Sequence, residues 1–200
     1  QTTREATVFA QGAQVRTCSR CRASETRTLA KLKPFIKLNA KTIPLKVKQS
    51  TTAVKVTMEK GDSIASWKSS NKKIATVNSK GKITGKKAGT AKITVTLKSG
   101  VKATIKVKVQ KKAVTTSKIS VTGKTSKIGK KLTLKKGKSA TLAVTVTPIT
   151  SKEKVTYKSS NKKVAAVTSK GKITAKKPGK AKITVKSGKK KVVITVTVKK

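Results

Sequence analysis

The stretch that decides the fold is WKSSNKKIATVNSKGKITGKKAGTAKITV, residues 67–95, because the chain repeats it 90 positions later. The second copy, YKSSNKKVAAVTSKGKITAKKPGKAKITV, covers residues 157–185, and 22 of the 29 aligned positions are identical without a gap. Most exchanges keep the character of the residue, as in Trp67 for Tyr157. A duplication of this kind indicates one folding unit present twice.

Each copy has the pattern of short strands separated by turns. In the first copy, a strand end at Trp67 runs into Ser-Ser-Asn at 69–71, whose short side chains can bond nearby backbone groups and end a strand. The β-branched segment 74–77 and the turn glycine Gly81 predict a small hairpin. Residues 91–97 then alternate apolar side chains with Lys or Thr, which is typical of a strand with one solvated face. No helical period occurs in the unit.

These motifs resemble the group 2 bacterial immunoglobulin-like domain. That family's signature is an aromatic residue followed by Ser-Ser-Asn, a short strand, a glycine turn, and Gly-Thr-Ala before an Ile-Thr-Val strand. The matching signature residues are Trp67, Ser70, Asn71, Gly81 and Gly89 in the first copy and Tyr157, Ser160, Asn161, Gly171 and Gly179 in the second. The resemblance implies a seven-stranded β-sandwich from a secreted or cell-surface bacterial protein, where it serves as a spacer or adhesive module.

The predicted fold is all-β, with two tandem immunoglobulin-like β-sandwiches preceded by a short Cys-containing hairpin segment. A repeat spacing of 90 residues in a chain of 200 suits two sandwiches of this class. We assign the N-terminal segment to residues 1–37, the first sandwich to 38–110, a linker to 111–117 and the second sandwich to 118–200. The start at Gln1 leads us to expect a fragment or a processed product, and the complete final strand ending at Lys200 leads us to expect a natural C-terminus.

Alternating aliphatic residues outside the signature predict the remaining strands. Pro44 requires an edge strand, because proline has no N–H to donate to a sheet ladder. Trp67 and Tyr157 are predicted to be core residues, the counterparts of the buried Trp of immunoglobulin sandwiches. The other predicted inward positions are Ile43, Leu45, Val47, Val54, Val56, Met58, Val101, Ala103, Ile105, Val107, Val109, Ile119, Val121, Leu132, Leu134, Leu142, Val144, Val146, Val155, Val192, Ile194, Val196 and Val198.

The N-terminal segment differs from the rest in composition, because it holds all five Arg and both Cys while every Lys lies at position 31 or beyond. We predict a small hairpin with Cys18 and Cys21 at its tip. The two cysteines are the only metal-ligand candidates, but they supply half of a four-ligand zinc site, and the chain has no His and no further Cys. A redox motif would need a thioredoxin-like βαβ setting. We favour a local disulfide or paired thiols belonging to an upstream module, and no cofactor is expected.

Catalysis is not expected from this composition. Acid–base chemistry usually needs His or paired carboxylates, and the repeats hold only Glu59, Asp62 and Glu153 as acids. Glu59 and Asp62 could be imagined as a calcium site, although calcium prefers six or more oxygens. Asn71 and Asn161 could form isopeptide crosslinks, but capping of a turn is the favoured role.

The lysines are the remaining functional candidates. Residues 31–200 contain 47 Lys against 3 acidic residues, on the outward positions of nearly every strand. Exposed lysine also prevents aggregation of sheet edges, so solubility is one explanation. The other is attachment to a polyanionic cell-wall polymer or an acidic glycan, or to nucleic acid without sequence specificity. The candidate contact residues are Lys92, Lys102, Lys106, Lys108, Lys182 and Lys186.

The predicted function is that of a non-enzymatic structural and adhesive module in a secreted or cell-surface bacterial protein. A non-specific polyanion binder is one alternative, and an accessory domain of a secreted hydrolase whose catalytic part lies upstream is another. The sequence has no apolar run long enough for a transmembrane helix, so no membrane insertion is expected.

Overall fold

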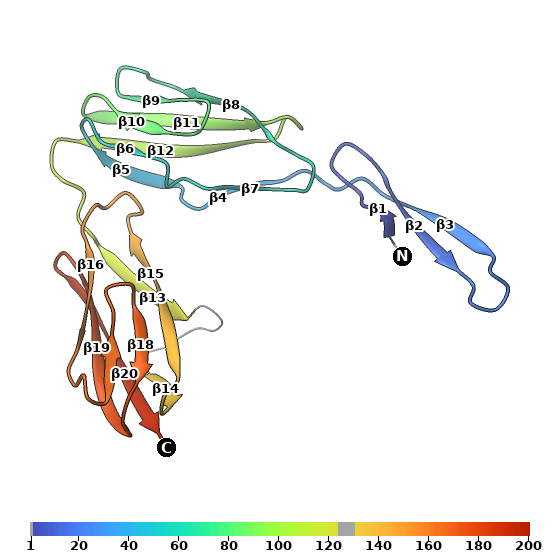
Figure 1. Cartoon of the computed structure of the whole chain (residues 1–200). Coiled ribbons are helices and arrows are strands. Elements are labelled where there is room, and N and C mark those ends of the chain that lie inside the picture. Colours follow the sequence, from blue (N-terminus) through green and yellow to red (C-terminus); the bar gives the residue numbers. More distant parts are fainter. Residues whose placement is uncertain (1, 124–130) are drawn as a thin grey trace. The chain divides into compact units, whose positions relative to one another are not determined.

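The computed structural model describes residues 2–123 and 131–200. Within these ranges the chain forms β-strands joined by turns, without a helix (Figure 1). It divides into two compact units, residues 1–113 and 114–200. Each unit holds one copy of the duplicated stretch, so the predicted all-β fold with two tandem sandwiches is confirmed.

An antiparallel three-stranded sheet precedes the first sandwich. Its strands pair in the order β1 (Thr2–Arg4), β2 (Gly12–Thr17) and β3 (Ser24–Leu29). The β2–β3 hairpin carries both cysteines in its turn, as predicted, whereas β1 was not predicted because it lacks apolar alternation. Most side chains of this sheet are exposed. The segment is tied to the sandwich by an ion pair between Glu5 and Lys60 and by the Val8 N–H, which donates to the Lys60 carbonyl at 3.2 Å.

The first sandwich has one complete four-stranded sheet and a divided opposing layer. The four-stranded sheet has the order β5-β12-β11-β8, with β5 (Thr42–Lys46), β8 (Ile64–Ser69), β11 (Gly89–Leu97) and β12 (Lys102–Gln110). The opposing layer consists of β4 (Ile36–Leu38) paired with β7 (Val56–Met58), and of β6 (Ser50–Thr51), β10 (Ile83–Gly85) and β9 (Ala75–Val77). Pro44 lies on the edge strand β5, as predicted.

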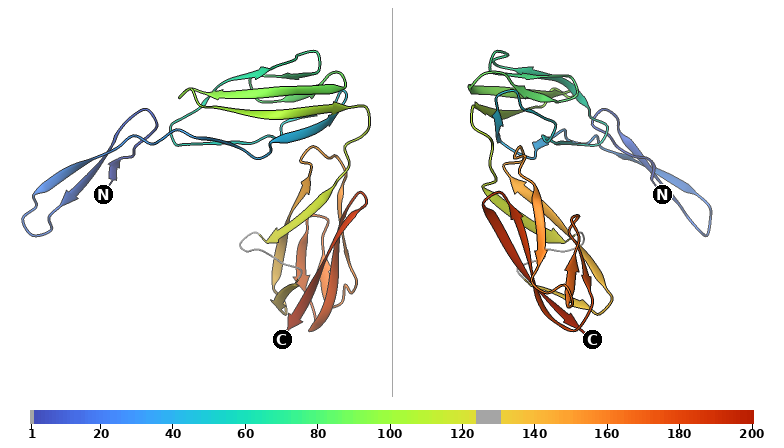
Figure 2. Two further views of the ribbon diagram at one scale, coloured as in Figure 1. Left: turned by 180° about the vertical axis from the view of Figure 1, so that it is seen from behind. Right: turned by 60° about the vertical axis from the view of Figure 1, so that its left-hand side comes forward.

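The second sandwich has two four-stranded sheets (Figures 1 and 2). One sheet has the order β14-β20-β19-β16, with β14 (Lys131–Lys135), β16 (Val155–Ser159), β19 (Gly179–Ser187) and β20 (Lys190–Lys199). The other has the order β13-β15-β18-β17, with β13 (Lys118–Gly123), β15 (Ser139–Thr147), β17 (Ala165–Val167) and β18 (Lys172–Ala175). Val114 and Thr116, from the segment assigned above to a linker, are buried within this unit.

In the divided layer of the first sandwich, a side chain takes the place of part of the backbone ladder. Where the second unit has the single strand β15, the first has β6 and β7 with residues 52–55 between them. The Asn39 side chain replaces the ladder at this point: its amide donates to the Ala53 carbonyl at 2.8 Å, and its oxygen accepts from the Lys55 N–H at 2.9 Å. These bonds satisfy the backbone groups that the interruption leaves unpaired.

The two cores consist of the aliphatic residues that alternation predicted. Ile43, Leu45, Ile105 and Val107 are fully buried in the first sandwich. Ile183, Val185, Ile194, Val196 and Val198 are among the corresponding residues of the second core. The other inward positions at strand ends and sheet edges, for example Val47, Met58, Val121, Leu132 and Val155, are half-buried because the opposing layer does not cover them completely.

Candidate functional sites: lysine faces, acidic clasps and a cysteine turn

The Ser-Ser-Asn signature ends one strand and starts the next by hydrogen bonding. The Ser69 hydroxyl donates to the Ala75 carbonyl at 2.7 Å, and the Ser70 hydroxyl accepts from the Lys92 N–H at 2.9 Å. The Asn71 side-chain oxygen accepts from the Lys73 N–H at 3.0 Å, which is the turn-capping role expected of it. The second copy repeats these bonds through Ser159, Ser160 and Asn161.

Trp67 and Tyr157 lie at inward positions, as predicted, but they are half-buried instead of fully buried. Tyr157 packs against the buried core of the second sandwich. Both face inward opposite Val95 and Val185, but they lie on the edge strands β8 and β16, where one side of the ring has no neighbouring strand. Each ring covers a turn glycine of the opposing layer. A Cβ on Gly81 would lie 2.9 Å from a Trp67 ring carbon.

The open side of the Trp67 ring borders a pocket of about 450 Å³. Its other lining residues are Lys68, Ser69, Lys72, Thr76 and Val77. In the second unit, the partial burial of the Tyr157 phenol raises its pKa, because the charged phenolate loses hydration there. The two aromatics therefore close the edges of their sandwiches while one side stays accessible.

A face rich in lysine covers the outside of the four-stranded sheet in the first unit. We call it the first lysine face, and its lysines are Lys46, Lys68, Lys92, Lys102, Lys106 and Lys108, all exposed. Between them lie threonines such as Thr94 and Thr104, whose hydroxyls are 3.2 Å apart. Lys92 lies directly opposite Lys106 across the β11–β12 ladder, and the four strands contain no acidic residue.

The second unit has an equivalent face on its β14-β20-β19-β16 sheet. The lysines of this second lysine face are Lys131, Lys135, Lys158, Lys180, Lys182, Lys186, Lys191 and Lys199, all exposed. Lys186 lies opposite Lys191, and again none of the four strands contains an acid. Within residues 2–123 and 131–200 none of the face lysines forms an ion pair, so their charges are exposed to solvent.

All six predicted polyanion-contact lysines lie on these two faces, four on the first and two on the second. Members on the neighbouring strands, such as Lys46, Lys68 and Lys158, were not among the predicted contact residues. Alternation tells which side of its own strand a lysine occupies, but the register between strands far apart in sequence decides which lysines become neighbours.

The acids that the sequence analysis weighed for calcium have structural roles instead. Asp62 binds the turn of the β11–β12 hairpin: its carboxylate accepts the Ser99 hydroxyl at 2.5 Å, the Ser99 N–H at 3.3 Å and the Ser63 N–H at 2.8 Å. Partial desolvation opposes ionisation of Asp62, but these bonds outweigh it and hold the pKa below its ordinary value of 3.8. The Glu59 carboxylate accepts the N–H of Lys60 at 3.0 Å.

Glu153 has the corresponding role in the second unit, which we call an acidic clasp: an acidic side chain that holds the turn of the last hairpin. Its carboxylate accepts the Thr116 N–H at 2.6 Å and lies against Gly188 in the β19–β20 turn. The Thr116 hydroxyl is 2.9 Å from that of Ser187, which is fully buried where the first unit has Leu97. In each sandwich an acid just before the aromatic strand therefore fastens the last hairpin. The scarcity of acids in the repeats was the signal that could have pointed to this role.

The turn between β2 and β3 brings the two cysteines together. Both thiols are free and exposed. The Cys21 N–H donates to the Cys18 sulfur at 3.5 Å, and hydrogen bonds from the Cys21 backbone, the Cys21 thiol and the Arg20 backbone lower the Cys18 pKa. The turn thus holds a pair of neighbouring thiols rather than the disulfide that was one of the favoured interpretations.

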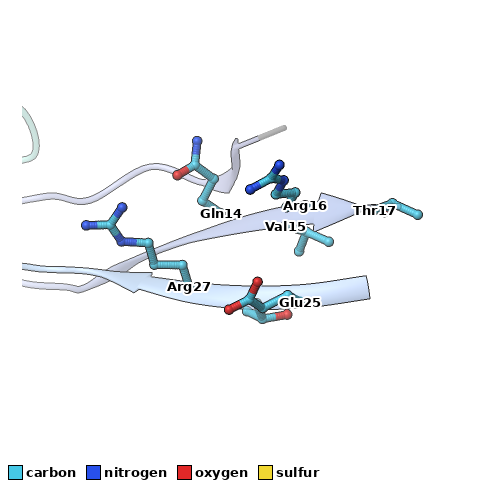
Figure 3. A pocket seen from close by; sticks show the side chains of 7 residues that line it. Gln14, Val15, Arg16, Thr17, Glu25 and Arg27 are labelled. Carbon is cyan, nitrogen blue, oxygen red and sulfur yellow. The ribbon is translucent and has the colours of Figure 1, made fainter. Parts of the chain in front are cut away.

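Two surface pockets lie along the same β2–β3 hairpin. The larger, of about 710 Å³, is lined by Gln14, Val15, Arg16, Thr17, Glu25, Thr26 and Arg27 (Figure 3). Its charged side chains come from both strands and are exposed. The second, of about 510 Å³, lies beside Cys18 and also includes Arg16 and Glu25.

Neither a metal cluster nor a membrane-crossing helix was found in the described part of the chain. No three side chains of His, Cys, Asp or Glu come together there in a way that could hold a metal ion. No helix there is long and apolar enough to cross a membrane.

The fold defines a tandem pair of immunoglobulin-like β-sandwiches. Residues 35–109 and 125–198 each match the family model of the bacterial Ig-like domain (group 2). Together the two matches cover more than half of the chain, which therefore belongs to this family.

Individual proteins resemble the chain more distantly. Kappa-carrageenase from Pseudoalteromonas carrageenovora is 53% identical over 58 residues, which is 28% of this chain and 15% of the enzyme. A structure of domains 4 and 5 of the S-layer protein SbsC has 22% identity and a TM-score of 0.40, covering 84% of this chain and 98% of that one. A Drosophila N-cadherin structure has 9% identity and a TM-score of 0.41, covering 94% of this chain and 76% of that one.

Proposed function

We propose that the chain is a non-enzymatic structural and adhesive module of a secreted or cell-surface bacterial protein, and that its lysine faces contact polyanionic wall polymers or acidic glycans. The observation that carries this proposal is the pair of lysine faces, each an exposed sheet surface without an acidic residue. Membership of the bacterial Ig-like family supports the structural part of the proposal.

The geometry of the faces suits an extended ligand. Alternate residues of a strand lie roughly 6.5–7 Å apart and neighbouring strands about 4.8 Å apart, so the ammonium groups are spread over a broad surface. Lysine is a flexible point charge that does not form the fixed fork of arginine. Such a surface favours a linear polymer with repeated negative charges, held by many weak contacts.

A role as the accessory domain of a secreted polysaccharide-degrading enzyme is a second candidate. The match to kappa-carrageenase favours it, because that protein is named for a polysaccharide substrate and shares 53% of 58 aligned residues. Carrageenan carries sulfate groups, so it also has the charge that the lysine faces would attract.

Retention on immobilised polymers tests the proposal. The intact chain should bind kappa-carrageenan and teichoic acid at about 0.15 M salt, where the screening length is about 8 Å. It should not bind agarose, a galactan without the sulfate groups. Loss of all retention at this salt concentration would indicate incidental charge instead of a binding face.

Two matched triple variants locate the contact. Replacing Lys92, Lys102 and Lys106 by Gln removes three charges from the first lysine face. The control replaces three exposed lysines elsewhere in the same sandwich, Lys37, Lys55 and Lys82. We expect the face variant to lower the slope of log affinity against log salt by about three, one for each contact, and the control to change it less. Equal effects would contradict a defined face.

A further inference from the structure

The cysteine turn at the tip of the β2–β3 hairpin is the one chemical motif that the proposed function leaves unused. Three hydrogen bonds shape it: the Cys18 N–H donates to the Ala23 carbonyl at 2.8 Å, the Arg22 N–H to the Cys18 carbonyl at 3.0 Å, and the Cys21 N–H to the Cys18 sulfur at 3.5 Å. The backbone therefore folds the two cysteines into one tight turn, with the Cys21 N–H directed at the Cys18 sulfur.

The residue after the second cysteine completes this shape. Arg22 has a φ of +58°, in the left-handed region that residues other than glycine seldom adopt. This conformation lets the chain reverse tightly, so that the Arg22 and Cys18 backbone groups bond across the turn. The Cys18 sulfur accepts the Cys21 N–H within this turn and is exposed, so it can still contact a metal ion. The thiolate is the form of cysteine that binds metals.

We propose that this turn is one half of a tetrahedral thiolate site for a soft divalent metal ion such as Zn²⁺, and that a second copy of the chain supplies the other half. Zinc in structural sites takes four ligands, commonly from Cys-x-x-Cys pairs. The chain has two Cys and no His, and its described part contains no third ligand grouped with them. Two copies together supply four thiolates around one ion.

The surroundings of the turn suit such a shared site. Cys18 and Cys21 are exposed, so a second turn can approach them. Each thiol gives its proton to solvent when it coordinates the metal, and four thiolates with one Zn²⁺ carry a net charge of about −2. Arg16, Arg20 and Arg22 are exposed and lie within two residues of a cysteine in the sequence, so the two copies supply six positive charges against this negative charge.

Titration of the reduced full-length chain with Co²⁺ tests the inference, because tetrahedral thiolate coordination of Co²⁺ gives characteristic visible and near-ultraviolet absorption. We expect these bands to saturate at one ion for every two chains. Sedimentation velocity at moderate salt should show a metal-dependent dimer with either Co²⁺ or Zn²⁺, and a chelator should restore the monomer.

Four variants make the test specific to the turn. Cys18→Ser and Cys21→Ser should each lose both the absorption bands and the dimer. Ser19→Ala, at a position between the cysteines, is the matched control and should retain both. Arg22→Gly should also retain both, because glycine adopts a positive φ without a steric penalty.

Three results would overturn the inference. The first is that the reduced protein shows no thiolate–cobalt absorption on addition of Co²⁺. This result counts against the inference whether or not the two thiols can form a disulfide in air. The second is saturation at one ion per chain with the protein still monomeric. The third is metal-dependent dimerisation that persists when both cysteines are replaced by serine.

Discussion

Asp62 joins two parts of the first sandwich that are far apart in sequence. It lies before the aromatic strand, while its partner Ser99 lies in the turn of the last hairpin, 37 residues later. Its hydrogen bonds favour the ionised carboxylate and hold the pKa below 3.8 even though partial desolvation acts the other way. A group whose pKa is lower in the folded than in the unfolded state stabilises the fold above its unfolded pKa, and this contribution is lost as the pH falls through the folded pKa.

Replacement of Asp62 by Asn should therefore lower the stability of the first sandwich at neutral pH, and the difference from the native chain should disappear as the pH falls below 3.8. The chain has a single Trp, in this sandwich, so thermal unfolding followed by Trp67 fluorescence reports on it selectively. Tyr157 emission, from the second sandwich, is the internal control and should not respond to the substitution. An undiminished difference at pH 2 would show that the charge of Asp62 is unimportant.

Gly81 tests how tightly the Trp67 ring is packed. Gly81→Ala introduces a Cβ that would lie 2.9 Å from the ring, at a φ of +73°. Gly100→Ala is the matched control, because Gly100 has a φ of +87° with no neighbouring atom within 4 Å of the new Cβ. The control should cost about 1–2 kcal/mol of unfolding free energy for its backbone strain alone.

Gly81→Ala should cost at least about 1 kcal/mol more than this control, because overpacking adds to the strain. Urea unfolding followed by Trp67 fluorescence measures both variants. Equal losses of stability would mean that the ring moves aside freely and that the edge of the sandwich is loosely packed.

The β11–β12 hairpin carries part of the first lysine face at a cost in stability. Like charges directly opposite in an antiparallel ladder repel, and Lys92 faces Lys106. Lys106→Glu should therefore stabilise the first sandwich by about 0.2–1 kcal/mol in urea unfolding while weakening retention on carrageenan. Lys37→Glu makes the same change of charge opposite Thr57 and should give a smaller gain in stability. No difference between the two variants would contradict a repulsive pair.

At the level of elements, alternation and the repeat were sufficient to predict most strands, because each pattern is contained within its own segment. The β9–β10 turn followed from Gly81, whose positive φ the turn requires. The interruption between β6 and β7, the clasp by Asp62 and the half-exposed position of Trp67 did not follow. Each depends on a partner elsewhere in the sequence: the Asn39 side chain, the Ser99 turn and the sheet edge at β8.

The whole molecule carries a formal net charge of +47, which predicts self-repulsion in the folded state. Raising the ionic strength from about 0.01 M to 0.15 M shortens the screening length from about 30 Å to 8 Å. The melting temperature should therefore rise for both sandwiches, as followed by Trp67 and Tyr157 emission. Unchanged melting over this range would show that the lysines do not strain the fold.

In each sandwich the strand β5 or β14 pairs in parallel with the last strand, β12 or β20. Parallel neighbours point the same way, so the start of β5 and the end of β12 lie at opposite ends of that sheet, and so do the start of β14 and the end of β20. A force that pulls these two ends apart would slide the paired strands past each other. It would load all the hydrogen bonds between them at the same time, instead of breaking them one after another. We therefore expect each sandwich to resist stretching along this direction, a property that the proposed adhesive function would use.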